Sequence, residues 1–145
     1  MEAKKLRIVY MGTPDFAVSP LAKLVEEGYN VVGVVTMPDK PSGRGLHVQQ
    51  SAVKRYALQA GLPVYQPEKL RDPAFVETFR SMRPDLGIVI AFPMLPGIIW
   101  AAPKLGTFNL HASLLPQYRG AAPINWALIN GETETGVTTF LLNRE

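Results

Sequence analysis

Two polar side chains, those of Asn109 and His111, close an otherwise apolar stretch of the sequence, T-F-N-L-H. Residues two apart on a β-strand point to the same side of a sheet. An amide can donate a hydrogen bond to a developing oxyanion, and an imidazole can exchange a proton near neutral pH. The pair could therefore promote addition to a carbonyl group. The same spacing fits two side chains that only cap the sheet, or two ligands of a metal site.

A covalent mechanism has little support in the sequence. Ser113 is the nearest hydroxyl, but it lies outside any G-x-S-x-G elbow, and the chain contains no cysteine. The only other histidine, His47, belongs to a Gly-rich segment, which leaves few ligands for a metal. Direct attack by an acceptor on the carbonyl carbon is therefore the simpler chemistry.

Cations on a flexible segment form a second group of candidates. The stretch P-D-K-P-S-G-R-G at 38–45 carries Lys40 and Arg44, and Lys54 and Arg55 follow soon after. Such cations could contact phosphates, or they could simply be solvated. Arg119, just before an expected helix, could likewise bind an anion or hold loop carbonyls.

The first loop, G-T-P-D-F at 12–16, argues against a dinucleotide cofactor. It has one glycine where the dinucleotide fingerprint has three, and Pro14 removes a backbone donor.

The elements that must position these residues alternate along the chain. Continuous apolar runs predict strands at 6–11, 31–35, 63–65, 86–92, 106–111 and 136–142. Apolar periodicity and end signals predict helices capped by Ser19 and ended by Gly28, at 51–60 before Gly61, at 72–82 with Asp72 as cap, at 97–101 and at 122–129. Segments 36–47 and 112–120 are expected to be loops. This alternation predicts an α/β fold, a Rossmann-like doubly wound, mostly parallel sheet with helices on both faces.

In such sheets, ligands bind beyond the carboxyl ends of the strands. The segments expected to form the ligand-binding site are therefore those that follow strands: 12–16, 36–47, 92–97, 109–120 and the residues after 142. The chain stops at Glu145, directly after an expected strand, so we expect the sheet to be truncated at its C-terminal end.

Composition sets outer limits on function. The chain has 145 residues, 47% of them hydrophobic, which suits one globular domain. A net charge of +3 permits contact with a polyanion without requiring it. The longest apolar run, 86–100, is interrupted by prolines and a glycine, and no signal peptide is evident. We therefore expect a cytoplasmic protein.

The segment F-N-L-H-A-S-L-L-P-Q-Y-R-G-A-A-P-I at 108–124 resembles the signature of the tetrahydrofolate-dependent formyltransferases. Two further segments, M-G-T-P-D-F-A-V at 11–18 and the one at 38–45, resemble the branch of that family that acts on aminoacyl-tRNA. The resemblance follows the whole chain in order.

The resemblance implies formyl transfer from 10-formyltetrahydrofolate to the amino group of methionyl initiator tRNA. We expect a monomer that needs no metal. Asn109 and His111 match two of three catalytic residues; the third, an Asp, is expected after the strand at 136–142, beyond Glu145. The residues implied to bind folate are Ser113, Leu114, Leu115 and Pro116, with Phe92, Met94 and Leu95 in the region that lines the pocket. Lys40 and Arg44 match a loop that approaches the tRNA acceptor stem.

The resemblance also sets limits. Many members carry Tyr-Gly where this chain has Phe92-Pro93, so the backbone contacts to folate there are open. The family adds a C-terminal β-barrel domain that grips tRNA, so residues 1–145 are expected to be an incomplete formyltransferase domain, inactive alone. Alternatives are a folate-dependent enzyme with a nucleotide or amino-sugar acceptor, and a non-catalytic folate- or ligand-binding module.

Overall fold

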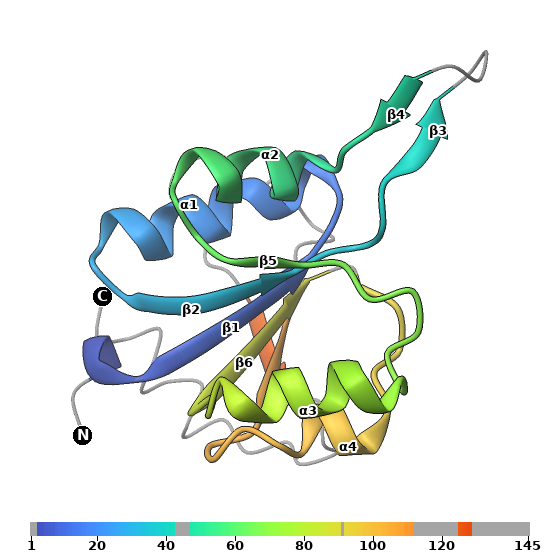
Figure 1. Ribbon diagram of the computed structural model, residues 1–145. Coiled ribbons are helices and arrows are strands. Elements are labelled where there is room, and N and C mark those ends of the chain that lie inside the picture. The colour runs from blue at the N-terminus through green and yellow to red at the C-terminus, as the bar shows by residue number, and fades with distance from the viewer. Residues whose placement is uncertain (1–2, 43–46, 91, 112–124, 129–145) are drawn as a thin grey trace.

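The computed structural model describes residues 3–42, 47–90, 92–111 and 125–128 (Figure 1). Within these ranges, no helix is long and apolar enough to cross a membrane.

A six-stranded sheet runs through the centre of the molecule in the order β5-β2-β1-β6-β7-β8. The strands are β1 (Arg7–Gly12), β2 (Asn30–Val35), β5 (Val64–Tyr65), β6 (Leu86–Ile90), β7 (Thr107–His111) and β8 (Asn125–Leu128). The first five are parallel, which confirms the predicted mostly parallel sheet, and β8 pairs antiparallel with β7 at the edge. The chain builds outward from β1 to β5, then returns to β6 on the other side of β1. The strand order thus reverses between β1 and β6, which is where α/β sheets bind ligands.

Helices cover both faces of the sheet, as predicted, and in the described part of the chain there are two on each face (Figure 1). Helices α1 (Val18–Glu26) and α2 (Ala52–Gln59) lie on one face, and α3 (Pro73–Ser81) and α4 (Gly97–Trp100) lie on the other. Two short 3-10 turns, η1 (Ala3–Lys5) and η2 (Asp15–Ala17), precede β1 and α1.

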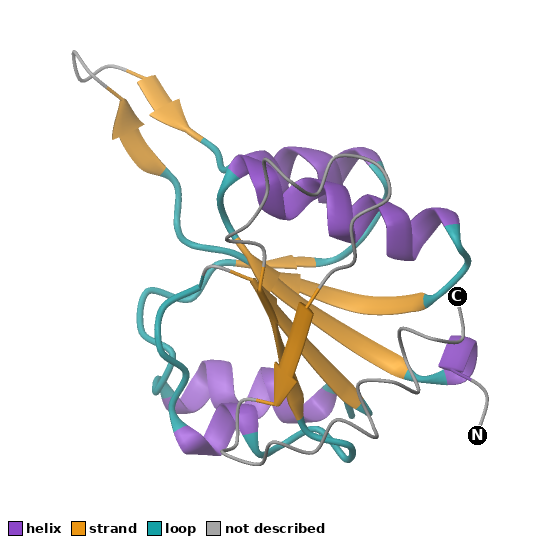
Figure 2. Ribbon diagram, turned by 180° about the vertical axis from the view of Figure 1, so that it is seen from behind, coloured by secondary structure: helices purple, strands orange, loops and turns teal. Residues whose placement is uncertain are grey.

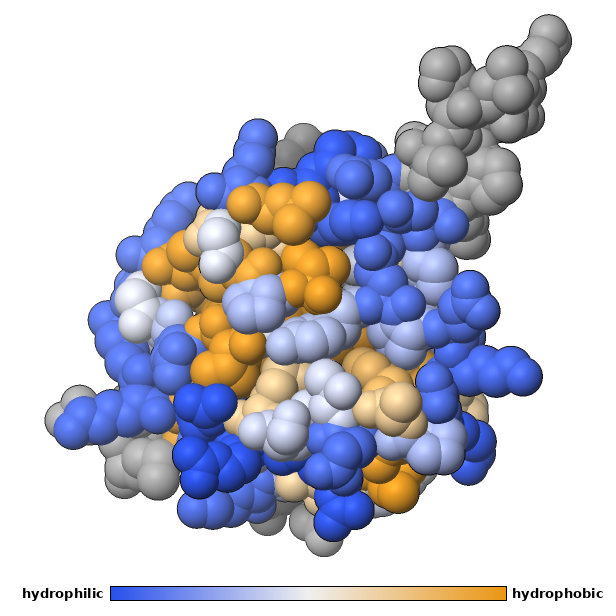
Figure 3. All heavy atoms as spheres, in the orientation of Figure 1, coloured by the Kyte–Doolittle hydropathy of each residue, from blue (hydrophilic) through white to orange (hydrophobic). Residues whose placement is uncertain are grey.

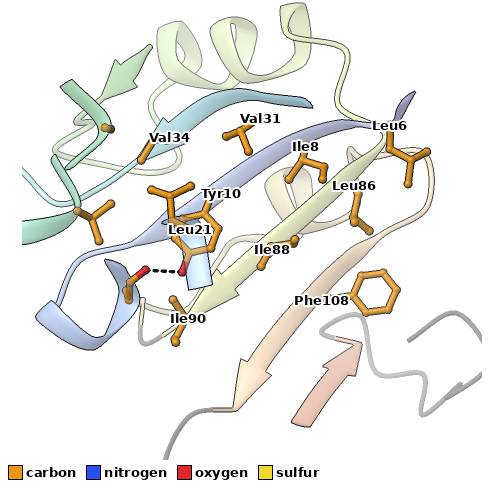
Figure 4. Close-up of a cluster of buried hydrophobic side chains, with 13 residues drawn as sticks. Leu6, Ile8, Tyr10, Leu21, Val31, Val34, Leu86, Ile88, Ile90 and Phe108 are labelled. Atoms are coloured by element: carbon orange, nitrogen blue, oxygen red, sulfur yellow. Dashed lines mark hydrogen bonds between the residues drawn. The ribbon is translucent and has the colours of Figure 1, made fainter. Parts of the chain in front are cut away.

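The central strand β1 contributes to both cores. Ile8 and Tyr10 belong to the core beneath α1 and α2, and Val9 and Met11 to the core beneath α3 and α4. Burial on both faces explains why this strand is apolar after Arg7 instead of alternating. The hydroxyl of Tyr10 is also buried, and it donates a 2.7 Å hydrogen bond to the carbonyl oxygen of Ala17 (Figure 4).

Helix ends follow local chemistry in most places. Asp72 caps α3 as predicted, since its carboxylate accepts from the amide of Ala74 at 3.2 Å. Gly28 and Gly61 follow α1 and α2 with φ of +88° and +77°, which glycine adopts without strain. The prediction that Ser19 caps α1 is wrong. The turn of η2 leads directly into α1, so Ser19 lies inside the helix and its side chain caps nothing.

Two expected segments differ in the structure. The stretch 36–47 is not only loop: β3 (Lys40–Ser42) pairs antiparallel with β4 (His47–Gln49) and forms a projecting arm (Figures 1 and 2). Pro41 fits there because the hairpin has few ladder bonds to lose. The helix predicted at 122–129 is wrong, because residues 125–128 form β8. Pairing with the free edge of β7 satisfies the backbone and overrides a weak helical preference.

Three further predicted segments, at 86–92, 112–120 and 136–142, reach residues that the structure does not describe. The strand predicted at 86–92 ends at Ile90. The loop at 112–120 and the strand at 136–142 lie outside the described residues.

Candidate functional site

The carboxyl ends of β1, β6 and β7 lie side by side at one edge of the sheet. Gly12, the last residue of β1, is in register with Ile90, the last residue of β6. A Cβ atom at Gly12 would lie 3.0 Å from both the Ala17 Cβ and the Ile90 Cγ2. Glycine therefore lets the two strand ends approach η2 closely at the point where the strand order reverses.

Asn109 extends this edge onto β7, where it is in register with Val89 of β6. The neighbouring Phe108 is buried in the core beneath α1 and α2, so Asn109 faces the opposite side, toward α3 and α4. Thr107 shares that side, and its hydroxyl donates a 2.7 Å hydrogen bond to the carbonyl of Trp100 in α4. The amide of Asn109 is half-buried. It thus has the partial shielding from water that strengthens a hydrogen bond to an oxyanion.

The structure brings two of the expected folate-binding residues to this same side. Leu95 is buried in the core beneath α3 and α4, and Phe92 is partly buried against it. Met94 is 93% exposed and is not part of that core. Of these three residues, only Phe92 and Met94 therefore keep side-chain surface that a ligand could contact.

The other predicted site residues are described less fully. The backbone of His111 ends β7 and pairs with Asn125, so it lies on the same strand as Asn109, but its side chain is outside the described part of the chain. The same holds for the side chain of Lys40 in β3. Ser113, Leu114, Leu115, Pro116, Arg44 and Arg119 all lie outside the described ranges.

Three hydroxyl groups that sequence reasoning missed hold the loops at this edge. The fully buried Thr36 lies 2.8 Å from the Ser51 hydroxyl and donates to the Thr13 hydroxyl at 3.3 Å. The Thr13 oxygen also accepts from the amide of Met37. Ser51 caps α2 by accepting from the amide of Lys54 at 3.0 Å. The ends of β1 and β2 and the start of α2 are therefore tied together, and the only signal in the sequence was a hydroxyl after each strand.

The base of the arm is fixed by a second polar network. Lys54 Nζ donates to Asp39 Oδ2 at 2.9 Å, and Gln66 Nε2 donates to Asp39 Oδ1 at 2.7 Å and to the carbonyl of Met37 at 3.1 Å. These bonds, that to Lys54 foremost, lower the pKa of Asp39 below its usual value. The ammonium of Lys54 is therefore committed to Asp39 and is not the free phosphate-contacting cation that its sequence position allowed.

Metal binding finds no support among the described side chains. No three His, Asp or Glu residues in these ranges are close enough together to bind a metal ion.

Comparison with known protein families matches residues 4–145 to the family described as formyl transferase. The chain belongs to the formyl transferase family. The F-N-L-H segment of this family member lies on β7, next to β6, and contains Asn109.

The chain is similar over all or nearly all of its length to proteins named methionyl-tRNA formyltransferase. It is 68% identical over 145 residues to a methionyl-tRNA formyltransferase of Bacteroides thetaiotaomicron, and 70% identical over 146 aligned residues to one of Parabacteroides distasonis. It is 57% identical over 140 residues to one of Flavobacterium johnsoniae. The alignments cover 100%, 100% and 97% of the chain, but 45%, 45% and 44% of those proteins. The chain thus spans about half the length of the curated relatives that it matches.

Proposed function

We propose that this chain is the folate-binding part of an enzyme that transfers a formyl group from 10-formyltetrahydrofolate to the amino group of methionyl initiator tRNA. The observation that carries the proposal is the position of Asn109. It lies half-buried on β7, at the carboxyl edge, within the segment that carries the family signature. Relatives named for this reaction are 57–70% identical to the chain.

The proposed chemistry is direct transfer. The free amine of the aminoacyl group attacks the formyl carbon held on N10 of the folate, and the carbonyl oxygen gains negative charge. The side chains of Asn109 and His111 donate hydrogen bonds to that oxygen. The bond from carbon to N10 then breaks, and the proton lost by the amine is passed to N10 with His111 as carrier. An aspartate following the 136–142 segment would orient the imidazole.

The folate would bind on the α3–α4 side of the sheet. The partly buried Phe92, which packs on the core that contains Leu95, would offer apolar surface there, and the segment 113–116 would supply the remaining contacts. Phe92-Pro93, where many family members have Tyr-Gly, belongs to the segment proposed to contact folate. Pro93 has no amide hydrogen, so a backbone donor to folate at this residue is not available.

The arm formed by β3 and β4 would contact the tRNA acceptor stem through Lys40 and Arg44. It projects from the carboxyl edge at which Asn109 lies (Figure 1). The network of Asp39, Lys54 and Gln66 sets the direction from which the arm leaves the body.

We further propose that the longer natural protein is a cytoplasmic monomer, in which a β-barrel domain after residues 1–145 grips the tRNA. Size-exclusion chromatography with light scattering would test the monomer.

The deciding experiment is a formyl-transfer assay on the protein expressed from its whole open reading frame. The 145-residue chain is assayed in parallel. Both receive 10-formyltetrahydrofolate with either methionyl initiator tRNA or glycinamide ribonucleotide. We expect the longer protein to formylate the tRNA only, and the 145-residue chain to show little turnover. Transfer to the nucleotide alone would refute the proposed acceptor, and no transfer to either would refute the proposed reaction. Equal turnover by the two proteins would refute the second domain's role.

A further inference from the structure

A basic cavity lies at the amino edge of the sheet, opposite the candidate site. Its volume is about 690 Å³, and it is formed where β1 and β6 begin and where α3 and α4 end. Figure 3 shows strongly hydrophilic side chains gathered at the lower left, where β6 begins and α3 ends in Figure 1. Its charged lining residues are Arg7, Arg80, Arg83, Lys104 and Asp85.

The cavity carries an excess of positive charge. Four cations and one carboxylate give the cavity a net charge of +3, which equals the net charge of the whole chain. Outside the cavity, the sequence therefore has as many Lys and Arg residues as Asp and Glu residues. A concave surface with one sign of charge focuses its field on the space within and attracts an oppositely charged ligand.

The carboxylate in the cavity forms no ion pair with the described cations around it. Asp85 Oδ2 accepts from the backbone amide of Arg7 at 2.9 Å, and Arg7 Nε donates to the carbonyl of Met82 at 2.8 Å. Among the described side chains, the ion pairs are Lys23–Glu27 and Lys54–Asp39, and neither involves a residue of the cavity. Arg80, Arg83 and Lys104 are exposed at its rim.

Arg83 occupies a position that suits arginine poorly. It follows Met82, the C-cap of α3, with a φ of +48°, and it is the only residue other than glycine with positive φ in the described ranges. Glycine is the usual residue at this position because it has no Cβ to strain the left-handed backbone. The arginine therefore places a charge at the cavity at a conformational cost.

We propose that this cavity binds a phosphate-bearing anion. A guanidinium group can donate two parallel hydrogen bonds to two oxygens of one phosphate group. Arg80 and Arg83 are therefore suited to hold one phosphate group between them. The exposed Ile98, at the same cavity, offers apolar surface to the remainder of the ligand. Because the cavity lies at the opposite edge from Asn109, this binding is separate from the proposed formyl transfer. The phosphate could belong to a small phosphorylated molecule or to an RNA strand.

The proposal is tested by titration calorimetry at fixed ionic strength, with tripolyphosphate as one probe and a ten-nucleotide single-stranded RNA as the other. The variants are Arg83→Gly and Arg80→Ala. The control is Arg71→Ala, which removes an exposed arginine outside the cavity. Arg83→Gly relieves the backbone, so its melting temperature should equal or exceed that of the wild type. A loss of binding would then not reflect unfolding.

We expect the wild type to bind, each cavity variant to lose about tenfold in affinity, and the control to retain it. Tighter binding of RNA than of tripolyphosphate, lost in the same variants, would assign the phosphate to a strand. The reverse order would assign it to a small molecule. The proposal is overturned if neither probe binds at millimolar concentration, or if Arg71→Ala weakens binding as much as Arg83→Gly. Because binding is read directly, these outcomes do not depend on formyl transfer.

Discussion

At the scale of single residues, the mechanism proposed above rests on two side chains of one strand, Asn109 and His111. Replacing either with Ala in the gene-length enzyme should lower kcat about 10²–10³-fold or more, because a hydrogen-bond donor to the oxyanion is lost. Folate affinity should change little, since neither residue supplies apolar surface. Single-turnover kinetics and folate titration would separate the two effects. Near-normal turnover in either variant would remove that residue from the mechanism.

Asp39 should make the base of the arm sensitive to acid. Its hydrogen bonds to Lys54 and Gln66 lower the pKa of its carboxyl in the folded state below the unfolded value of about 3.9. Its stabilising effect is therefore complete above that value and is lost as the pH falls through the lower, folded-state pKa. We expect Asp39→Asn to lower the melting temperature at pH 7, and the difference from the wild type to shrink toward pH 3.

The matched control for Asp39→Asn is Asp72→Asn. Asp72 is an exposed N-cap, and asparagine is an equally good cap, so this variant should melt near the wild type at pH 7. A difference between wild type and Asp39→Asn that stays constant from pH 7 to pH 3 would contradict the role given to the carboxylate.

At the scale of elements, the first turn of α2 depends on Ser51, whereas that of α1 does not depend on Ser19. Ser51→Ala removes the bond to the amide of Lys54 and leaves the buried Thr36 hydroxyl with one fewer partner. We expect it to lower the free energy of unfolding by about 1–2 kcal/mol. Urea denaturation would measure this change.

Ser19→Ala tests the corrected start of α1 and serves as the control for Ser51→Ala. Ser19 is exposed inside the helix, and alanine is a better helix former, so the variant should be as stable as the wild type or slightly more so. A loss as large as that of Ser51→Ala would restore Ser19 as the cap.

Local signals explain why most elements were predictable from sequence. A stretch of strand buried on both faces must be apolar, as β1 is after Arg7 and as β6 is along its length. Asp72-Pro73 or a glycine with positive φ marks a helix end within a few residues. The arm and β8 were missed because each is defined by pairing. Residues 125–128 become a strand only because the edge of β7 is free, which no periodicity in that segment records.

The same distinction applies to the candidate site. The position of Asn109 on a strand could be predicted because the residues on either side of it are apolar. The bonds from Asp39 to Lys54 and Gln66 join residues 15 and 27 positions apart, so the sequence showed three polar residues without showing that they meet.

At the scale of the whole molecule, β1 couples the two cores. Alternate side chains of this strand, such as Ile8 and Val9, enter opposite cores, so disorder in one core should displace residues of the other. Phe79→Ala empties a fully buried position beneath α3 and should lower the free energy of unfolding by about 3–5 kcal/mol. Leu58→Ala, at a half-exposed position of α2, is the control and should have a much smaller effect.

Hydrogen exchange distinguishes one cooperative unit from two. If β1 couples the cores, the most protected amides of α1 should lose as much protection in Phe79→Ala as those of α3, although α1 lies on the opposite face of the sheet. If the cores open separately, only α3, α4 and their strands should exchange faster, and α1 should keep its wild-type protection. We expect the first result, because neither core retains its central strand when β1 is released.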